Sequence, residues 1–266
     1  MPVAADAFYL IDHRLLAIVM VAVLLAACEI GYRLGLRRVD VPDSKRTLIS
    51  GIGGAMFGLL GLLLGFALAM AISRWDARRD VIIQEANAIG TLSLRTVLLE
   101  EPLRGQLQEA MRAYAEARVV LGGSRDQPDV LGKALSDSED LHVVIWSVVE
   151  RVNQPNTSNA VLSSQINSAN QVIDLHELRL SSLQNHLPAT LFYMLVSLGA
   201  VSVGFIAWGF GAASSHRGRA PPVLLAILIA AVLLLIMDVN RPQRGIIAVG
   251  VAPLERTAES IDELGK

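Results

Sequence analysis

The chain has 266 residues, of which 53% are hydrophobic and only 5% aromatic, with a formal net charge of −2 and a mean hydropathy of +0.47. These values are typical of an integral membrane protein rather than of a soluble domain. The small net charge and the lack of a basic patch interleaved with aromatic residues exclude a nucleic-acid partner. The single cysteine, Cys28, excludes an internal disulfide and a zinc site built from several thiolates.

Four apolar runs are long enough to cross a bilayer, which takes about 20 helical residues. They cover residues 15–36, 51–73, 189–213 and 222–237. The fourth run is the shortest, and we expect its helix to continue past Asp238. Tyr32, Trp75 and Trp208 lie near the edges of these runs, where aromatic residues are enriched in membrane proteins. The sequence therefore predicts an all-α membrane protein with four transmembrane helices.

The first run contains Leu-Ala-Ala-Cys at residues 25–28, a pattern at which bacterial lipoproteins are cleaved and acylated. This interpretation would leave three spans in the mature chain. Asp6, Asp12 and only one fixed positive charge, Arg14, precede the run, which is a poor start for a signal peptide. We therefore favour a small buried thiol at Cys28, with the lipoprotein as the alternative.

The second run carries glycines at spacings of three and four: Gly51, Gly54, Gly58, Gly61 and Gly65. Small residues at this spacing let helices approach closely in a membrane, where lipid supplies no hydrophobic drive for association. We therefore predict helix packing through Gly54, Gly61 and Gly65, within one subunit or between neighbours. A pore lined by these glycines is the alternative.

A cluster of charges follows the second run directly, at Arg74, Asp76, Arg78 and Arg79. Long cationic side chains at the end of a span commonly reach back to the lipid headgroups. We interpret Arg74, Asp76 and Arg78 as a charge collar at the membrane exit of this helix.

Residues 74–188, between the second and third runs, read as long amphipathic helices without strand alternation. Helix breaks are expected from Gly122 to Pro128 and over residues 153–159. A last helix, residues 165–186, leads almost without interruption into the third run at Pro188. The predicted organisation is spans 1 and 2 over residues 1–73, a helical extramembrane domain over 74–188, spans 3 and 4 over 189–240, and a C-terminal segment, 241–266, that packs on this domain.

Polar residues in apolar or helical settings have structural explanations. Glu29 is interpreted as an ion pair with Arg33, one turn on, with an ion pathway at Glu29 as the alternative. Residues 137–140 are interpreted as a helix cap with acidic first-turn residues. Four residues on the helix before the third run are predicted to form a solvated face, with no metal site, because two histidines ten residues apart do not converge on an ion: Asp174, His176, Glu177 and His186.

Common catalytic sequence motifs are missing from the chain. It contains no His-Glu-x-x-His, no Gly-x-Ser-x-Gly and no phosphate-binding loop. We therefore expect neither enzymatic activity nor a cofactor.

One short pattern resembles a known family. Leu64-Gly65-Phe66, followed after seven residues by Arg74-Trp75, resembles the second transmembrane helix of the bestrophins. Residues 73–79, 85–90 and 238–245 are similar to a bacterial membrane family usually labelled bestrophin-like, and that similarity covers most of the chain.

The resemblance implies a homopentamer with an axial pathway for inorganic ions, embedded in lipid. The apolar neck of bestrophins, carried over position by position, falls on Gly58, Leu62 and Phe66. Gly58 departs from the family pattern because a bulky apolar residue is usual there, so the gate would depend on Leu62 and Phe66. No acidic run like the bestrophin calcium clasp occurs, and we expect no calcium site.

Two functions and two orientations follow from these observations. The first function is a bestrophin-like oligomeric ion channel, and the alternative is a non-conducting membrane scaffold or sensor. Arginines and lysines flank both sides of the spans about equally, so the positive-inside rule leaves the orientation open. The resemblance favours a multi-pass protein of the bacterial inner membrane with a cytoplasmic domain.

Overall fold

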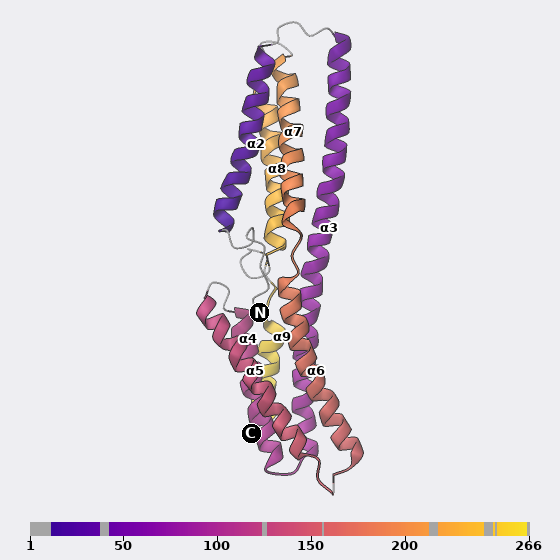
Figure 1. The fold of residues 1–266 in the computed structure, drawn as a ribbon, viewed down its shortest axis with the longest axis vertical. Coiled ribbons are helices and arrows are strands. Elements are labelled where there is room, and N and C mark those ends of the chain that lie inside the picture. The colour runs from indigo at the N-terminus through magenta and orange to yellow at the C-terminus, as the bar shows by residue number, and fades with distance from the viewer. Residues whose placement is uncertain are drawn as a thin grey trace. The chain divides into compact units, whose positions relative to one another are not determined.

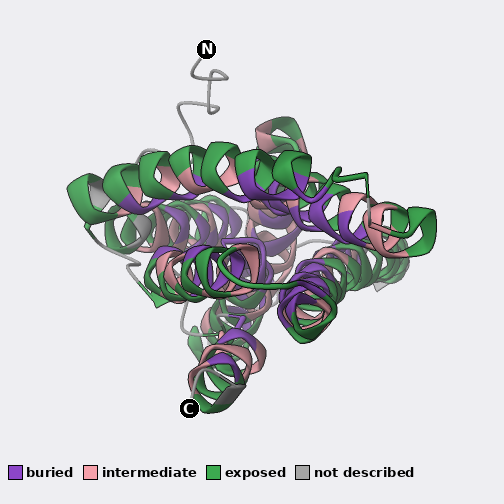
Figure 2. Cartoon of the chain, turned by 90° about the horizontal axis from the view of Figure 1, so that it is seen from below, coloured by how far each residue is buried: buried purple, intermediate pink, exposed green. Residues whose placement is uncertain are grey.

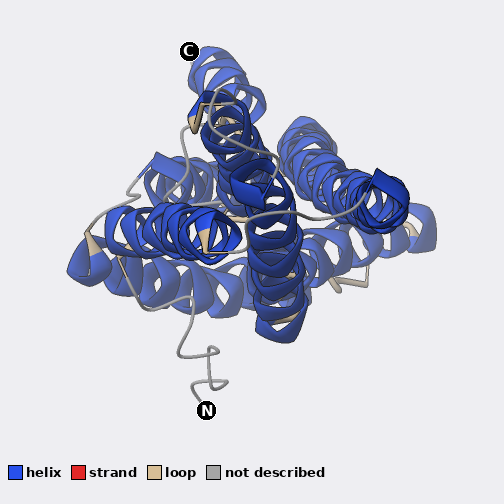
Figure 3. Ribbon diagram, turned by 90° about the horizontal axis from the view of Figure 1, so that it is seen from above, coloured by secondary structure: helices blue, strands red, loops and turns tan. Residues whose placement is uncertain are grey.

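The computed structural model describes residues 12–37, 43–123, 127–155, 157–212, 218–241, 247 and 249–264. Within these ranges the chain is helical and contains no strand (Figure 3). The expected residues 242–245 of the bestrophin-like pattern lie outside the described residues. The elements in chain order are α2 (His13–Leu36), α3 (Asp43–Arg95), the 3-10 helix η1 (Thr96–Leu98), α4 (Leu103–Gly123), α5 (Pro128–Arg151), α6 (Asn159–Gln184), α7 (Ala189–Ala212), α8 (Ala220–Val239) and α9 (Ala252–Leu264).

Among the described residues, four stretches of helix are long and apolar enough to cross a membrane: Arg14–Leu36, Thr47–Leu98, Asn159–Ala212 and Ala220–Val239. They contain the four runs expected from the sequence, apart from the last residue of the third. The fourth helix continues past Asp238 to Val239, as expected from its short apolar run. The prediction of an all-α membrane protein with four apolar spans is confirmed.

The described helices fall into two compact units. The first unit contains Met1–Ser73 and His186–Arg241, and the second unit contains Arg74–Asn185 and Pro242–Lys266. The apolar runs all lie in the first unit, whereas charged residues recur through α4, α5, α6 and the part of α3 after Ser73. We therefore treat the second unit as lying outside the membrane-spanning segments.

In the first unit, α2, α7 and α8 lie side by side (Figure 1). The contact between α2 and α7 is made through glycines on both helices. A Cβ atom added at Gly31 would lie 2.0 Å from the carbonyl oxygen of Gly204, and one at Gly35 would lie 2.2 Å from the carbonyl oxygen of Trp208. Glycine is required here because the two backbones touch, which is how helices associate in lipid.

Two further predictions for α2 can be compared with the structure. Cys28 is buried, with 3% of its surface exposed. The Glu29–Arg33 ion pair is confirmed, since Arg33 Nε lies 2.6 Å from Glu29 Oε1. Arg219 adds a second, looser contact to the same carboxylate at 3.6 Å.

The second unit is built around an apolar core shared by α4, α5, α6, α9 and the end of α3. Each helix carries buried residues on one side and exposed residues on the other (Figure 2). The breaks expected after Gly122 and before Asn159 are confirmed, since α4 ends at Gly123, α5 begins at Pro128, and Ser158 caps the start of α6. Leu254 and Ile261 of α9 belong to the buried core of this unit.

The sequence predicted that the helix before the third span continues to residue 186 and leads almost without interruption into that span, but the structure has a break between the two helices. α6 ends at Gln184 and α7 begins at Ala189. Pro188 disfavours a helical conformation for Leu187, the residue before it. The backbone N–H of Leu187, left without a helical partner, donates a hydrogen bond of 3.0 Å to the side-chain oxygen of Asn240 in the first unit.

Candidate functional site

One face of α3 is apolar and open. Gly58, Leu62 and Phe66 recur every fourth residue and so share one side of the helix. Leu62 is 55% exposed and Phe66 58% exposed, although both are large and apolar. The opposite side of α3 is buried instead, at Leu60 and Ala67 among others.

The glycine stripe of α3 belongs to the same open side. The stripe consists of Gly51, Gly54, Gly58, Gly61 and Gly65. A Cβ atom added at any of them would have no atom of a neighbouring described segment within 4 Å. These glycines therefore make no close helix contact within the part of the chain that the structure describes. Packing of Gly54, Gly61 and Gly65 against a neighbouring subunit stays a prediction.

The charged residues after the second span have different surroundings. Arg78 is 3% exposed and donates hydrogen bonds to the carbonyl oxygens of Ser182, at 3.1 Å, and Asn185, at 2.7 Å. Those carbonyls end α6, so the guanidinium compensates the negative end of that helix. Arg74 is partly buried, and Asp76 is exposed.

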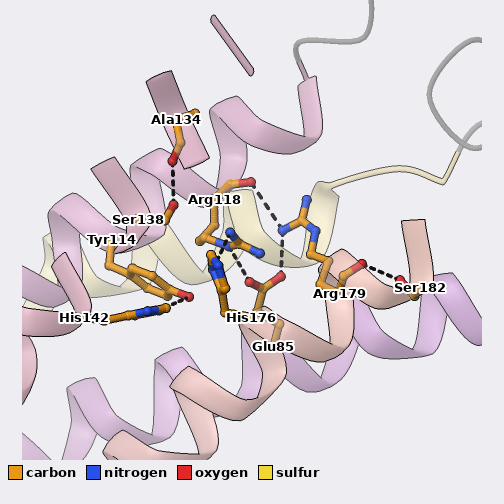
Figure 4. A network of polar contacts seen from close by, with 9 residues as sticks. All are labelled: Glu85, Tyr114, Arg118, Ala134, Ser138, His142, His176, Arg179 and Ser182. Carbon is orange, nitrogen blue, oxygen red and sulfur yellow. Dashed lines mark hydrogen bonds and ion pairs between the residues drawn. The ribbon is translucent and has the colours of Figure 1, made fainter. Parts of the chain in front are cut away.

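A second candidate site is a buried charge cluster in the second unit (Figure 4). Glu85 of α3 accepts hydrogen bonds at both carboxylate oxygens. Arg118 Nε of α4 lies 2.5 Å from Oε1, and Arg179 Nη1 of α6 lies 2.6 Å from Oε2. The side chains of Glu85 and Arg118 are fully buried and that of Arg179 is 4% exposed. One carboxylate therefore faces two guanidinium groups, which leaves an excess positive charge in the core.

Two histidines extend this cluster. His176 Nδ1 lies 2.9 Å from Arg118 Nη1, and His142 packs edge-on against the His176 ring at a centroid distance of 4.6 Å. His142 Nε2 lies 3.1 Å from the hydroxyl oxygen of Tyr114. Because arginine has no acceptor, Arg118 must be the donor to His176 Nδ1. This contact assigns the proton of neutral His176 to Nε2.

The cluster keeps both histidines neutral. Burial, followed by the Arg118 charge, lowers the pKa of His176 to about 3. Burial also lowers the pKa of His142, with Arg118 adding to the effect. Burial raises the pKa of Tyr114 above its usual range, so this phenol stays protonated. The site is therefore cationic through its arginines and not through its imidazoles.

The prediction of a solvated face is wrong for His176, which is only 1% exposed. Glu85, Arg118 and Arg179 were missed as a group because they lie on three separate helices. One signal was available in the sequence. Arg118 follows Tyr114 by one turn on the apolar side of α4, and a charge at such a position indicates a buried partner.

Gly122 shows how tightly the cluster is enclosed. A Cβ atom there would lie 2.1 Å from Val251 Cγ1 and 2.8 Å from Arg179 Nη2. We expect Gly122→Ala to displace Arg179 from Glu85 and to lower the free energy of unfolding by about 1–3 kcal/mol. Thermal unfolding measures this, with Gly123→Ala as the control because a Cβ atom added at Gly123 would meet no atom of the described residues within 4 Å. Equal losses in both variants would contradict the expected clash.

A metal centre is not indicated by the described residues, in which no three His, Cys, Asp or Glu side chains come together as a ligand set.

Comparisons with known proteins give matches over most of the chain. A family model described as a Bestrophin-like domain matches residues 16–254. A comparison with curated proteins finds no match. A crystal structure of a bacterial bestrophin homolog from Klebsiella pneumoniae has a TM-score of 0.62 at 13% sequence identity, covering 94% of this chain and 95% of that chain. A mutant of that homolog has a TM-score of 0.63 at 11% identity, covering 90% and 96%.

A further crystal structure, described as a membrane protein, has a TM-score of 0.65 at 12% identity and covers 93% of this chain and 94% of that chain. At such identities the structural likeness establishes the fold alone. The family model covers the first apolar run from residue 16, the other three runs completely, and both candidate sites. The chain therefore belongs to the bestrophin-like family.

Proposed function

We propose that this chain forms a homo-oligomeric ion channel, with a pentamer favoured, whose neck is lined by α3. Membership of the bestrophin-like family and the shared fold support a channel. The observation that carries the proposal is the open apolar side of α3, where Leu62 and Phe66 are each more than half exposed. In an oligomer, copies of this side would meet around a common axis.

The proposed neck is formed by stacked rings of Gly58, Leu62 and Phe66. Narrow apolar rings resist ion passage because water withdraws from them. The missing side chain at Gly58 leaves its ring wide, so closure depends on the rings of Leu62 and Phe66. The conducted species are inorganic ions crossing the bacterial inner membrane.

The proposed topology places residues 74–188 in the cytoplasm, with both chain termini on the same side. The C-terminal segment contributes α9 to this domain, and its buried Leu254 and Ile261 support that assignment. Accessibility of single cysteines, introduced at exposed sites of α5 in a Cys28→Ser background, to a membrane-impermeant thiol reagent tests the orientation.

Planar-bilayer recording tests the channel. Purified protein should conduct, and Leu62→Ala and Phe66→Ala should each increase the conductance several-fold, because a smaller side chain widens and wets the neck. Leu228→Ala is the control, since Leu228 is an equally exposed leucine, at 55%, on a different span, α8. A silent bilayer at high protein loading, or equal effects of all three substitutions, would contradict the proposal.

A non-conducting oligomeric scaffold or sensor is the second candidate, favoured by the open glycines of α3. Glycines that contact no other helix of the described chain allow a helix of a second subunit to pack closely against them. Native mass spectrometry and low-resolution imaging distinguish the two functions. A ring with α3 around its axis supports the channel, whereas a dimer joined through Gly54, Gly61 and Gly65 supports the scaffold.

A further inference from the structure

The two histidines of the charge cluster differ in their access to solvent. His142 of α5 is partly exposed, whereas the neighbouring His176 of α6 is 1% exposed (Figure 4). Their rings are in edge-on contact at 4.6 Å between centroids. A proton arriving from solvent therefore meets His142 first and His176 second.

His142 can bind a proton without losing its partner. Its Nε2 lies 3.1 Å from the Tyr114 hydroxyl, which can donate to a neutral imidazole or accept from a protonated one. The raised pKa of Tyr114 keeps that hydroxyl protonated in both cases. Protonation of His142 thus costs charge repulsion but no hydrogen bond.

His176 cannot bind a proton in this arrangement. Its Nδ1 accepts from Arg118, and its Nε2, which carries the only proton, is buried with no hydrogen-bond partner in the described structure. A proton on Nδ1 would leave two donors facing each other at 2.9 Å. Proton binding at His176 and the Arg118–His176 contact therefore exclude each other.

The charges around the pair oppose protonation on balance, because the two arginines outweigh the single carboxylate. The ionisable groups that face it are Glu85 from α3, Tyr114 and Arg118 from α4, and Arg179 beside His176 on α6. Before any histidine is protonated, Glu85 contributes one negative charge, and Arg118 and Arg179 contribute two positive charges. A charge on His142 and one on His176 would repel each other across the contact between α5 and α6, and His142 would also be repelled by Arg118 of α4.

We propose that His142 and His176 form a proton-binding site that releases α5 from α4 and α6 when the protein is acidified. The closed arrangement excludes a proton on His176 and is weakened by charge repulsion when His142 is protonated, whereas the open arrangement accepts protons on both. The contacts of this site lie entirely within the second unit, so the site can be tested by a measurement that does not depend on ion conduction.

The direction of the pH effect follows from proton linkage. Both histidines have a lowered pKa in the closed unit, so below about pH 6.5 the open form binds protons that the closed form does not. Closure is therefore fully favoured above about pH 6.5 and weakens progressively as the pH falls toward about 3.

Amide hydrogen exchange of the full chain in lipid nanodiscs, at pH values from 7.5 to 4.5, tests this site. After correction for intrinsic exchange, opening of α5 should rise up to about tenfold per pH unit below about pH 6.5 for each histidine that titrates. Opening of α8 should not follow this dependence. A flat response of α5 over the whole range would overturn the proposal.

Matched variants assign the response to this pair. His142→Gln and His176→Gln each remove a titrating ring and keep an amide oxygen that can accept a hydrogen bond, and the double variant should lose the acid-dependent rise in α5. His186→Gln, outside the cluster, should respond like the natural chain. If His176→Gln does not fold, His142→Gln alone still has to reduce the rise. An undiminished rise in the variants would overturn the proposal.

Discussion

Replacing Glu85 by glutamine is expected to lower the free energy of unfolding of the second unit by about 3–5 kcal/mol. The carboxylate is the acceptor for Arg118 and Arg179, and all three side chains are buried. Glutamine has nearly the same shape but no charge, so two guanidinium groups would remain in the core without a counterion. Chemical denaturation followed by circular dichroism, on purified protein in detergent, measures the loss.

Glu116 provides the matched control for this substitution. It lies on α4 like Arg118, and its contact with Arg112 is 3.3 Å long with more than half of each side chain exposed. Glu116→Gln should cost less than about 1 kcal/mol, because solvent screens exposed pairs. A comparable, small effect of both substitutions would show that the buried cluster is not held by its charges.

The Gly31→Ala substitution should separate α2 from α7. The added Cβ would lie 2.0 Å from the Gly204 carbonyl oxygen and 2.9 Å from the Gly204 Cα. Both obstructing atoms belong to the backbone, so relief requires a shift of a whole helix rather than of one side chain. Overpacking of this kind typically costs about 1–3 kcal/mol, and more is expected where backbone blocks backbone. Thermal unfolding in detergent should show a lower midpoint.

Gly61→Ala on α3 is the control for Gly31→Ala, because a Cβ at Gly61 meets no atom of the described chain within 4 Å. It should leave the stability of the separated protomer unchanged or slightly improved, since alanine favours a helix more than glycine does. If subunits pack through the α3 stripe, the same substitution should lower the oligomeric fraction. Equal destabilisation of the protomer by Gly31→Ala and Gly61→Ala would contradict the role assigned to the α2–α7 contact.

Helix α3 carries both candidate sites, with Phe66 on its open apolar side and Glu85 in the charge cluster. Phe66 lies in the first unit and Glu85 in the second. Conductance measurements on Phe66→Ala and exchange measurements on His142→Gln report on separate parts of the molecule.

The transmembrane helices and the helix breaks at residues 122–128 and 153–159 could be predicted from the sequence, because each depends on residues close together in the chain. The helix cap interpreted at residues 137–140 was wrong, since these residues lie inside α5. A span requires only an uninterrupted apolar run of sufficient length. Pro128 can begin a helix but not continue one, and the Ser158 side-chain oxygen accepts a hydrogen bond from the backbone N–H of Val161 in the first turn of α6. The bestrophin-like family was likewise recognisable from short stretches, residues 73–79, 85–90 and 238–245.

Glycine spacing was a weaker guide. The packing prediction was based on the stripe of five glycines in α3. In the described chain, however, Gly31 and Gly35 of α2 are the glycines whose backbone lies against the backbone of α7. A glycine pattern shows that a helix can be approached closely. Which helix approaches it depends on the arrangement of all the helices, and this is not encoded locally.

The sequence by itself determined that this is a helical membrane protein of the bestrophin-like family, since hydropathy, helix caps and short patterns are local properties. The charge cluster, by contrast, could be recognised only from the tertiary structure. Glu85 meets Arg118 from 33 residues away and Arg179 from 94 residues away. On each separate helix these residues look like ordinary charged positions, and His176 looks like part of a solvated face. Packing of three helices removes them from water, and burial is what makes their pairing necessary.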